Sequence, residues 1–367
     1  MTQNRLHYFD MAKGIGIFLV LLGHLQGDWF FSLSPYILPL CTWIFSFHIP
    51  LFFMISGMLI RYKNDPEKEM KVLLKRRFSS IMVPYFWFSF FYLLVVLYAL
   101  ITGSVKPQTF FLQVWYVLGM YGMNVLWFLP ALFGGEILFL WIRKKCSGKI
   151  TSLVIFLLTA AATVANLCFK EYCSGGVMGE RIGEVVITLL RPVFAAAFIA
   201  AGYFLFGLMK KQDGYSASSI LTGALLLALN LFTFRYNGGV DFRSLVQNNI
   251  ALYYLCAVSG SMGVILLCKN LPAARCVTFW GVNSLIVMAV HNNETVLYYG
   301  MKLAMLLNRY LTHARGYICY LTVVVIISLY VTLMILLINR FFGFIVSKPS
   351  FLDKWIGKYR KGMNSKP

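Results

Sequence analysis

Three of the five histidines in this 367-residue chain fall within long apolar stretches: they are His24, His48 and His291. An ionisable side chain at membrane depth costs a few kcal/mol to insert, so a chain that keeps one generally uses it. The ordinary pKa of histidine lies near neutrality, which makes this residue the usual general base or proton carrier. Each imidazole could instead serve as a hydrogen-bonding contact between helices. We expect the three histidines to be catalytic and keep the structural role as the alternative.

The elements that must position these histidines are helices that cross a membrane. Hydrophobic residues make up 59% and charged residues 13% of the chain, and the mean hydropathy is +0.73, whereas a soluble domain has about 25% charged residues. Stretches of suitable length and apolarity lie near residues 14–31, 36–60, 78–102, 125–142, 150–168, 185–208, 217–235, 247–268, 276–298 and 317–346. Because a span needs about 20 mostly apolar residues, we predict an all-α bundle of about ten transmembrane helices. It covers residues 1–346, and a basic cytoplasmic tail, 347–367, follows.

The basic residues indicate the orientation of this bundle. If the N-terminus is cytoplasmic, the predicted spans place 24 of the 33 lysines and arginines on the cytoplasmic side. Cytoplasmic loops are enriched in these two residue types. We therefore expect both termini to be cytoplasmic, which requires an even number of spans. The formal net charge of +20 then reflects topology and contact with anionic membrane lipid, and we expect no nucleic-acid partner.

The three histidines also share a similar depth in the predicted bundle. At 1.5 Å rise per residue, His24 lies roughly 15 Å, His48 roughly 18 Å and His291 roughly 22 Å from the cytoplasmic ends of their helices. Three imidazoles at one depth favour a common site over three unrelated contacts. A zinc site would need closer ligands or carboxylate support, which the sequence does not identify. We therefore predict no bound metal.

Polar residues near the histidines indicate a cavity. Pro50, two residues after His48, removes a backbone donor and frees a carbonyl, so the helix can bend there. Four further polar or amphipathic side chains within or beside the apolar stretches are candidates for contact with a substrate: they are Asn283, Ser284, Trp127 and Glu136. A carboxylate such as that of Glu136 is too costly to face lipid.

Lys13, ten intervening residues and His24 together resemble a signature of the acyltransferase-3 family of integral membrane O-acyltransferases. Most members have arginine at the first position, and the lysine form is similar to the subgroup related to fucose 4-O-acetylase. Further blocks of the family pattern, in the expected order, are Phe47-His48-Ile49-Pro50-Leu51-Phe52-Phe53 with Ser56-Gly57, Arg76-Arg77 before Val83-Pro84-Tyr85, Trp127-Phe128-Leu129-Pro130-Ala131-Leu132, and Gly281 to His291. Two positions depart from the pattern. Lys13 keeps the charge but loses the planar fork of arginine, and Ser80 stands where relatives often have a basic residue.

The resemblance implies transfer of an acyl group, usually acetyl, from cytoplasmic acetyl-CoA to a hydroxyl of an extracytoplasmic glycan or lipid-linked sugar. It also implies a multi-pass protein of the inner (plasma) membrane of a bacterial cell. Lys13, Arg76 and Arg77 would hold the phosphates of the acyl-CoA, with solvated loop arginines as the alternative. A pantetheine arm of roughly 15 to 20 Å would bring the thioester to the depth of His24.

In such a reaction His24 would be the general base that removes the proton of the acceptor hydroxyl. A covalent acyl-histidine intermediate is a variant of this role. His48 and His291 would orient the acceptor or relay the proton. Asn283 or Ser284 would help them to stabilise the developing oxyanion.

The competing interpretation is a proton-coupled transporter or exporter of a glycan precursor. In that class the histidines would relay protons and no bond would form. No internal inverted repeat supports it. A sensor or membrane-anchoring domain is a third interpretation, which the lack of a fused domain weakens. The identity of the acceptor, the oligomeric state and the choice between acetyl, succinyl and other acyl groups stay open.

Overall fold

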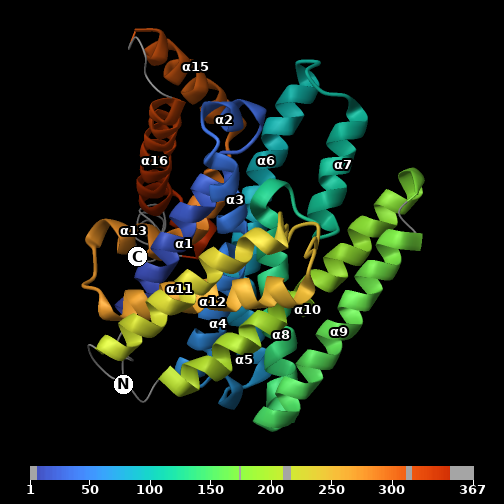
Figure 1. Cartoon of the computed structure of the whole chain (residues 1–367). Coiled ribbons are helices and arrows are strands. Elements are labelled where there is room, and N and C mark those ends of the chain that lie inside the picture. Colours follow the sequence, from blue (N-terminus) through green and yellow to red (C-terminus); the bar gives the residue numbers. More distant parts are fainter. Residues whose placement is uncertain (1–5, 173–174, 210–215, 311–315, 348–367) are drawn as a thin grey trace, which may run out of the picture.

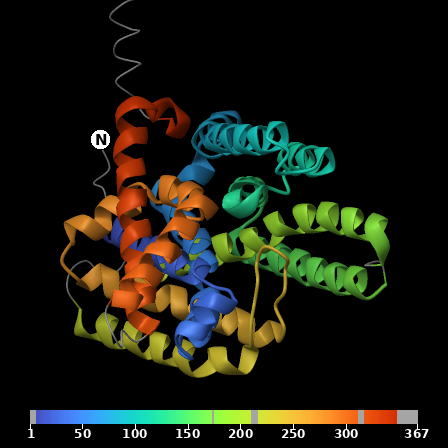
Figure 2. The ribbon, with the colours of Figure 1, turned by 90° about the horizontal axis from the view of Figure 1, so that it is seen from above.

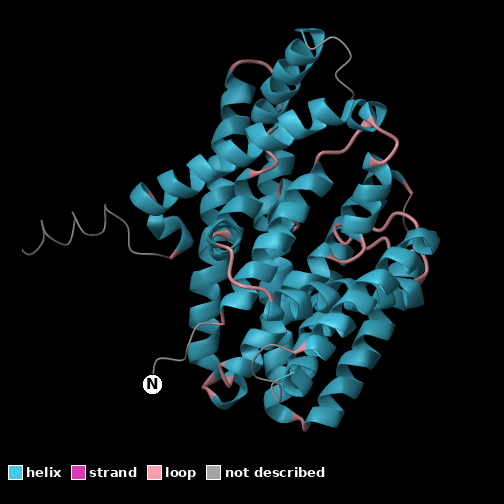
Figure 3. Ribbon diagram, turned by 60° about the vertical axis from the view of Figure 1, so that its left-hand side comes forward, coloured by secondary structure: helices cyan, strands magenta, loops and turns pink. Residues whose placement is uncertain are grey.

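The computed structural model describes residues 6–172, 175–209, 216–310 and 316–347 (Figure 1). Within these ranges the chain is helical almost throughout and forms no β-strand beyond an isolated bridge between Asp241 and Val246. Figure 3 shows helices joined mostly by short loops. The prediction of an all-α helical bundle is therefore confirmed. Of the predicted tail, 347–367, only Ser347 belongs to the described residues.

The first half of the chain forms eight α-helices: α1 (His7–His24), α2 (Asp28–Leu33), α3 (Ile37–Phe45), α4 (His48–Tyr62), α5 (Met70–Arg77), α6 (Val83–Ile101), α7 (Pro107–Leu118) and α8 (Phe128–Lys145). The described part of the second half adds α9 (Gly148–Tyr172), α10 (Gly176–Met209), α11 (Ala217–Asn237), α12 (Ile250–Asn270), α13 (Arg275–Val282), α14 (Ser284–Val290), α15 (Glu294–Tyr310) and α16 (Gly316–Phe341). Short helical turns are η1 (Asp65–Glu67), η2 (Phe78–Met82), η3 (Asn124–Trp127) and η4 (Gly343–Val346).

Eight helical segments of the described chain are long and apolar enough to cross a membrane. They are Ile37–Tyr62, Met70–Ile101, Asn124–Lys145, Gly148–Glu171, Met178–Met209, Ala217–Asn237, Ile250–Asn270 and Gly316–Phe341. They correspond to eight of the ten predicted spans. The first predicted span, 14–31, differs because α1 ends at His24 after 18 residues and carries charged residues in its first half. The ninth, 276–298, is divided among α13, α14 and the start of α15.

The helices pack around a central group. Helix α10 packs against α4, α8 and α9, while α4 also contacts α1 and α12, and α1 packs along α13. Figure 2 shows α9 and α10 (green) and α6 and α7 (teal) extending from one side of this group, with α16 (red) on the other. Large apolar side chains remain exposed on these outer helices, including Val95, Phe156 and Leu329. Such apolar outer faces suit contact with lipid.

Two glycines allow the helices of the central group to approach closely. A Cβ atom at Gly281 of α13 would collide with the carbonyl oxygen of Asp10 in α1, and one at Gly57 of α4 would collide with that of Ile199 in α10. Small residues at such contacts are typical of membrane helices, because they let two backbones meet. A larger side chain at either position would push apart helices that position the histidines.

Two helix breaks lie beside candidate site residues. Between α3 and α4 the chain turns through Ser46 and Phe47 and becomes helical again at His48. Pro50 has no N–H to bond the Ser46 carbonyl, so the sequence itself causes this turn, and the predicted bend is confirmed. The second break, at Asn283 (φ −107°, ψ 17°), separates α13 from α14. Both breaks replace a continuous span with a bent one at a polar position.

Candidate active site

One cavity of about 700 Å³ lies inside the bundle. One end of the cavity, the Lys13 end, is lined by Lys13, Arg77, Ser80 and Glu136. The other end, the loop end, is lined by Gln26, Asn124, Asn292, Asp241 and Arg243, the last two from the loop between α11 and α12. Along α1 the lining runs from Lys13 to His24, which is about 16 Å at the helical rise. The cavity therefore extends through much of the bundle.

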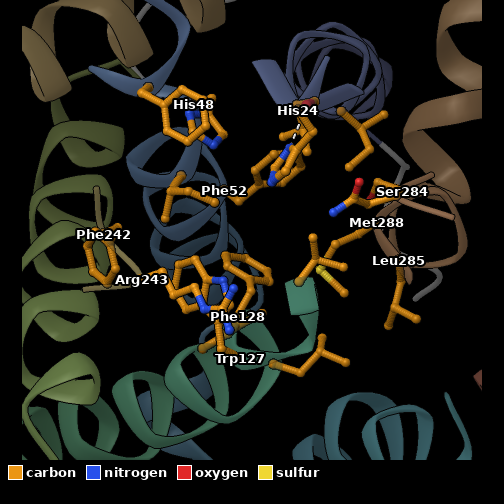
Figure 4. A pocket seen from close by; sticks show the side chains of 18 of the residues that line it. His24, His48, Phe52, Trp127, Phe128, Phe242, Arg243, Ser284, Leu285 and Met288 are labelled. Atoms are coloured by element: carbon orange, nitrogen blue, oxygen red, sulfur yellow. Dashed lines mark hydrogen bonds between the residues drawn. The ribbon is translucent and has the colours of Figure 1, made fainter. Parts of the chain in front are cut away.

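The structure brings the three predicted histidines together. His24 and His48 line the cavity, on the side facing Trp127 (Figure 4). His291 does not line it, but its ring meets the ring of His24 edge to face, with centroids 4.8 Å apart and an interplanar angle of 73°. The ring of Phe45 contacts both His24 and His48. Its centroid lies 5.9 Å from that of the His24 ring and 4.9 Å from that of the His48 ring. Two histidines therefore form part of the cavity wall, and the third supports one of them.

The ring orientation of all three histidines is fixed by backbone carbonyls about one helical turn earlier in the chain. In each, Nδ1 contacts the backbone carbonyl four residues earlier. The distances are 2.8 Å from His24 to Val20, 2.8 Å from His48 to Ile44 and 3.0 Å from His291 to Val287, with a further 2.9 Å from His291 to Met288. A carbonyl oxygen only accepts, so Nδ1 must carry the hydrogen in these bonds. The lone pair then lies on Nε2, which is the nitrogen free to accept a proton.

The Nε2 atom of His291 is buried without a hydrogen-bond partner among the described residues. The whole side chain is 3% exposed. Leaving a buried acceptor unpaired costs about 1–3 kcal/mol, so such an atom in a native structure points to a special role or to a missing donor. Since the Nδ1 hydrogen of His24 is bonded to Val20, the neighbouring His24 ring can supply a proton or hydrogen bond here only when its own Nε2 is protonated.

The Lys13 end of the cavity is dominated by paired charges. Arg77 lies between two carboxylates: its Nη2 atom is 2.8 Å from Asp65 Oδ2, and its Nε atom is 2.9 Å from Glu136 Oε2. The second contact is an ion pair without hydrogen-bond alignment. Ser56 donates a short hydrogen bond to the other oxygen of Glu136. Glu136 is only 2% exposed. Its carboxylate therefore faces Arg77 and Ser56 inside the bundle and not lipid, as expected.

The carboxylate of Asp65, in the turn between α4 and α5, forms ion pairs with three cationic side chains. Arg76 lies 2.6 Å, Lys68 2.7 Å and Arg77 2.8 Å from its carboxylate oxygens. Burial by itself would raise the pKa of Asp65, but hydrogen bonds from Arg76 and Lys68 and the charge of Arg77 outweigh burial. The pKa of this carboxyl is therefore held below its ordinary value.

The three cations predicted to bind acyl-CoA thus have different surroundings. Lys13 lines the cavity and forms an ion pair of 2.9 Å with Asp10 on the preceding turn of α1. Arg77 lines the cavity but is held between two carboxylates. Arg76 does not line the cavity; its side chain is 40% exposed and bonded to Asp65. The sequence could not separate these adjacent arginines, because their roles depend on which helix face meets the cavity.

Three of the four predicted substrate contacts lie on the cavity wall. They are Ser284, Trp127 and Glu136. Asn283 does not line the cavity: its Nδ2 atom donates to the Phe279 carbonyl at 2.8 Å, and its Oδ1 atom accepts from Asn339 of α16 at 2.8 Å. The side chain of Asn283, at the helix break, therefore links α13 to α16 by hydrogen bonds.

The sequence interpretation missed the charged residues in and around the loop end. Arg191 lies in the middle of α10 and is 1% exposed, and the same cost argument that singled out the histidines applies to it. Asp241 and Arg243 gave no such signal, because their loop reaches the cavity only through tertiary packing. Asn292 donates from Nδ2 to Asn124 Oδ1 at 2.8 Å and so links α14 to η3 at this end.

A multi-pass helical bundle with histidines beside a long internal cavity, which has polar residues at both ends, defines a membrane protein with an internal candidate active site. Residues 6–337 match the family described as an acyltransferase domain, so the chain belongs to the acyltransferase-3 family. A stretch of 64 residues is 50% identical to nodulation protein NolL of Mesorhizobium japonicum and covers 16% of this chain and 16% of that relative. No solved structure matches the chain significantly.

Proposed function

We propose that this protein is a membrane O-acyltransferase that moves an acyl group, in the first instance acetyl, from cytoplasmic acyl-CoA to a hydroxyl of an extracytoplasmic glycan or sugar. Family membership supports acyl transfer, and the lysine form of the signature favours the subgroup related to fucose 4-O-acetylase. The observation that carries the proposal is the single cavity that joins Lys13 to His24 and continues to the loop end. With both termini cytoplasmic, in a bacterial inner membrane, donor and acceptor enter from opposite ends and meet at the histidines.

The residues of the Lys13 end suit an acyl-CoA donor. Its phosphates need cations, and Lys13 and Arg77 line the cavity there. The distance of about 16 Å along α1 from Lys13 to His24 suits a pantetheine arm of roughly 15 to 20 Å. Bound acyl-CoA supplies an acyl group activated as a thioester. We assign the main phosphate contact to Lys13, since Arg77 is held between two carboxylates, whereas Lys13 pairs with one, Asp10, and is the more exposed of the two.

His24 is the histidine best suited to be the general base. It is half-buried in the cavity wall, and its Nδ1–H bond to Val20 leaves Nε2 as the proton acceptor. During transfer the acceptor oxygen bonds to the acyl carbon while the carbon–sulfur bond breaks. The hydroxyl proton passes to Nε2 of His24 and then to the departing thiolate. His48 orients the hydroxyl from the same wall, and His291 supports the His24 ring.

The substitution His24→Ala tests this proposal. Loss of a general base typically lowers the rate by about 10²-fold or more, while little packing is lost at a half-buried position. Acetyl groups on surface glycans would be measured by mass spectrometry, alongside the amount of protein in the membrane. His7→Ala is the matched control, because His7 is exposed at the start of the same helix.

Retention of more than about a tenth of wild-type acetylation by His24→Ala would exclude a general base with the usual effect and leave His24 with a structural role. Loss of the glycan itself from the cell surface, and not only of its acetyl groups, would favour the exporter.

A further inference from the structure

The loop 238–249 between α11 and α12 lies at the loop end of the cavity and is folded by its own hydrogen bonds. Asp241 exchanges both backbone hydrogen bonds with Val246, at 2.9 and 2.8 Å. Its carboxylate accepts hydrogen bonds from the backbone N–H groups of Arg243 at 2.8 Å and Ser244 at 3.2 Å. Asp241 is the one carboxylate among the described residues that line this end of the cavity, and it is used to shape the loop.

Two cationic side chains from neighbouring helices donate hydrogen bonds to backbone carbonyls of the same loop. Arg191 of α10 donates from Nε to the Arg243 carbonyl at 2.9 Å and from Nη1 to the Tyr121 carbonyl at 2.8 Å. Lys170 of α9 donates to the Leu245 carbonyl at 3.0 Å. A carbonyl satisfies the N–H groups of a cation but does not cancel its charge. Asp241 is the carboxylate of the same loop, so Arg191, Lys170 and Arg243 outnumber it three to one and give this region a net positive charge.

The Arg243 guanidinium faces this positive region without an anionic partner. Its side chain lines the cavity, close to Trp127 and Phe128 (Figure 4). Among the described residues it forms no ion pair or side-chain hydrogen bond, and its guanidinium carbon lies 6.0 Å from the centroid of the Tyr121 ring. Guanidinium groups bind carboxylates and phosphates through paired N–H donors. An arginine that lines a cavity and has no anionic partner in the protein is suited to bind an anionic ligand.

We infer that the loop end binds the acceptor and that Arg243 takes an anionic group, a carboxylate or a phosphate, carried by the acceptor sugar. The inference rests on the proposed function. The apolar rings of Trp127 and Phe242, stacked with centroids 5.8 Å apart and an interplanar angle of 15°, line the cavity beside the guanidinium. A sugar ring has matching apolar C–H faces, while its hydroxyls can reach Asn124 and Asn292.

The experiment measures thermal unfolding of the full-length protein in detergent with three sugars at rising concentration: glucose, glucuronate and glucose 1-phosphate. Glucuronate or glucose 1-phosphate should stabilise the wild type by mass action, and glucose should do so far less. Which of the two anions is more effective distinguishes a carboxylate from a phosphate. Arg243→Ala should weaken the apparent affinity for the better anion by about tenfold or more, and Arg243→Lys should restore part of it.

The Arg243→Ala variant should fold, because Arg191 holds the backbone carbonyl of residue 243 and not its side chain. Arg235→Ala is the matched control, since Arg235 is an exposed arginine near the same end of α11. Acetyl-CoA should stabilise the wild type, Arg243→Ala and Arg235→Ala equally, because its proposed site is at the Lys13 end.

Equal stabilisation by glucose and both anions, no stabilisation by either anion, or no difference between Arg243→Ala and the wild type would overturn the inference. The acetyl-CoA effect would then still stand for the proposed function. Conversely, stabilisation by an anionic sugar through Arg243, without any effect of acetyl-CoA, would retain the anion site and refute the acyl-CoA donor.

Discussion

Both ends of the cavity contain arginines, and they differ in what surrounds the guanidinium groups. At the Lys13 end Arg77 lies between Asp65 and Glu136, two buried carboxylates. At the loop end Arg191 is held by carbonyls, and Arg243 has no anionic partner among the described residues. In the first arrangement the guanidinium group is paired with carboxylates from two other elements, whereas in the second one guanidinium group is bonded to carbonyls and the other has no anionic partner among the described residues. The number of basic residues therefore does not indicate where an anion binds. The groups that each basic side chain already contacts are the better indicator.

The strongest test of this comparison removes the charge at the centre of the paired cluster. Asp65 is fully buried and bonded to three cations. Asp65→Asn should lower the free energy of unfolding by about 3 kcal/mol, the cost typical of breaking a buried ion pair from one side. Thermal unfolding in detergent measures the effect. Glu67→Gln is the control, because Glu67 is exposed in the same turn. If both variants unfold at the wild-type temperature, the cluster is not a structural element.

A smaller effect should separate the cations predicted to bind acyl-CoA. Lys13→Gln should weaken acetyl-CoA binding by about tenfold, because a charge-assisted phosphate contact is lost. Arg76→Gln should change it by less than about twofold, as expected for an exposed charge outside the cavity. Binding would be measured as the concentration dependence of thermal stabilisation, and added salt should weaken it in the wild type. An equal loss in Arg76→Gln would show that the pair with Asp65 leaves this arginine available to the donor.

Features set by local sequence could be predicted well. Composition and apolar length identified the helical bundle and eight of its spans. The bend before His48 followed from Pro50 alone, since a proline removes a helix hydrogen bond wherever it lies. The meeting of His24 and His291 was expected from their common depth. These inferences needed only the rise of a helix and the cost of polar groups in lipid.

Features that depend on a tertiary partner could not be predicted. Arg76 and Arg77 are adjacent and chemically identical, yet only one faces the cavity. Asn283 was expected to contact substrate, but α16 supplies an amide that binds it instead. The loop containing Arg243 shows no periodicity, and nothing local indicates that it covers the histidines. Arg191 is the exception, because an arginine inside an apolar span can be recognised from sequence.

The smallest predicted effect is a change with pH in the stability difference between the wild type and Asp65→Asn. The pKa of Asp65 is lowered in the folded protein, chiefly by its hydrogen bonds to Arg76 and Lys68 working against burial. A group of this kind stabilises the fold above its unfolded pKa, which is about 4 for aspartate, and loses that contribution as the pH falls through the lower folded value. The stability difference between wild type and Asp65→Asn should therefore be largest near neutral pH and shrink progressively below about pH 4.

Melting temperatures of both proteins, measured in one detergent from pH 7 to about pH 3, would show the effect. Contributions from the other carboxylates are common to both proteins, so they largely cancel in the difference. A gap that stays constant down to the lowest pH would mean that the charge of Asp65 does not stabilise the fold. The Lys13 end would then owe its stability to packing, and the contrast with the loop end would no longer rest on paired charges.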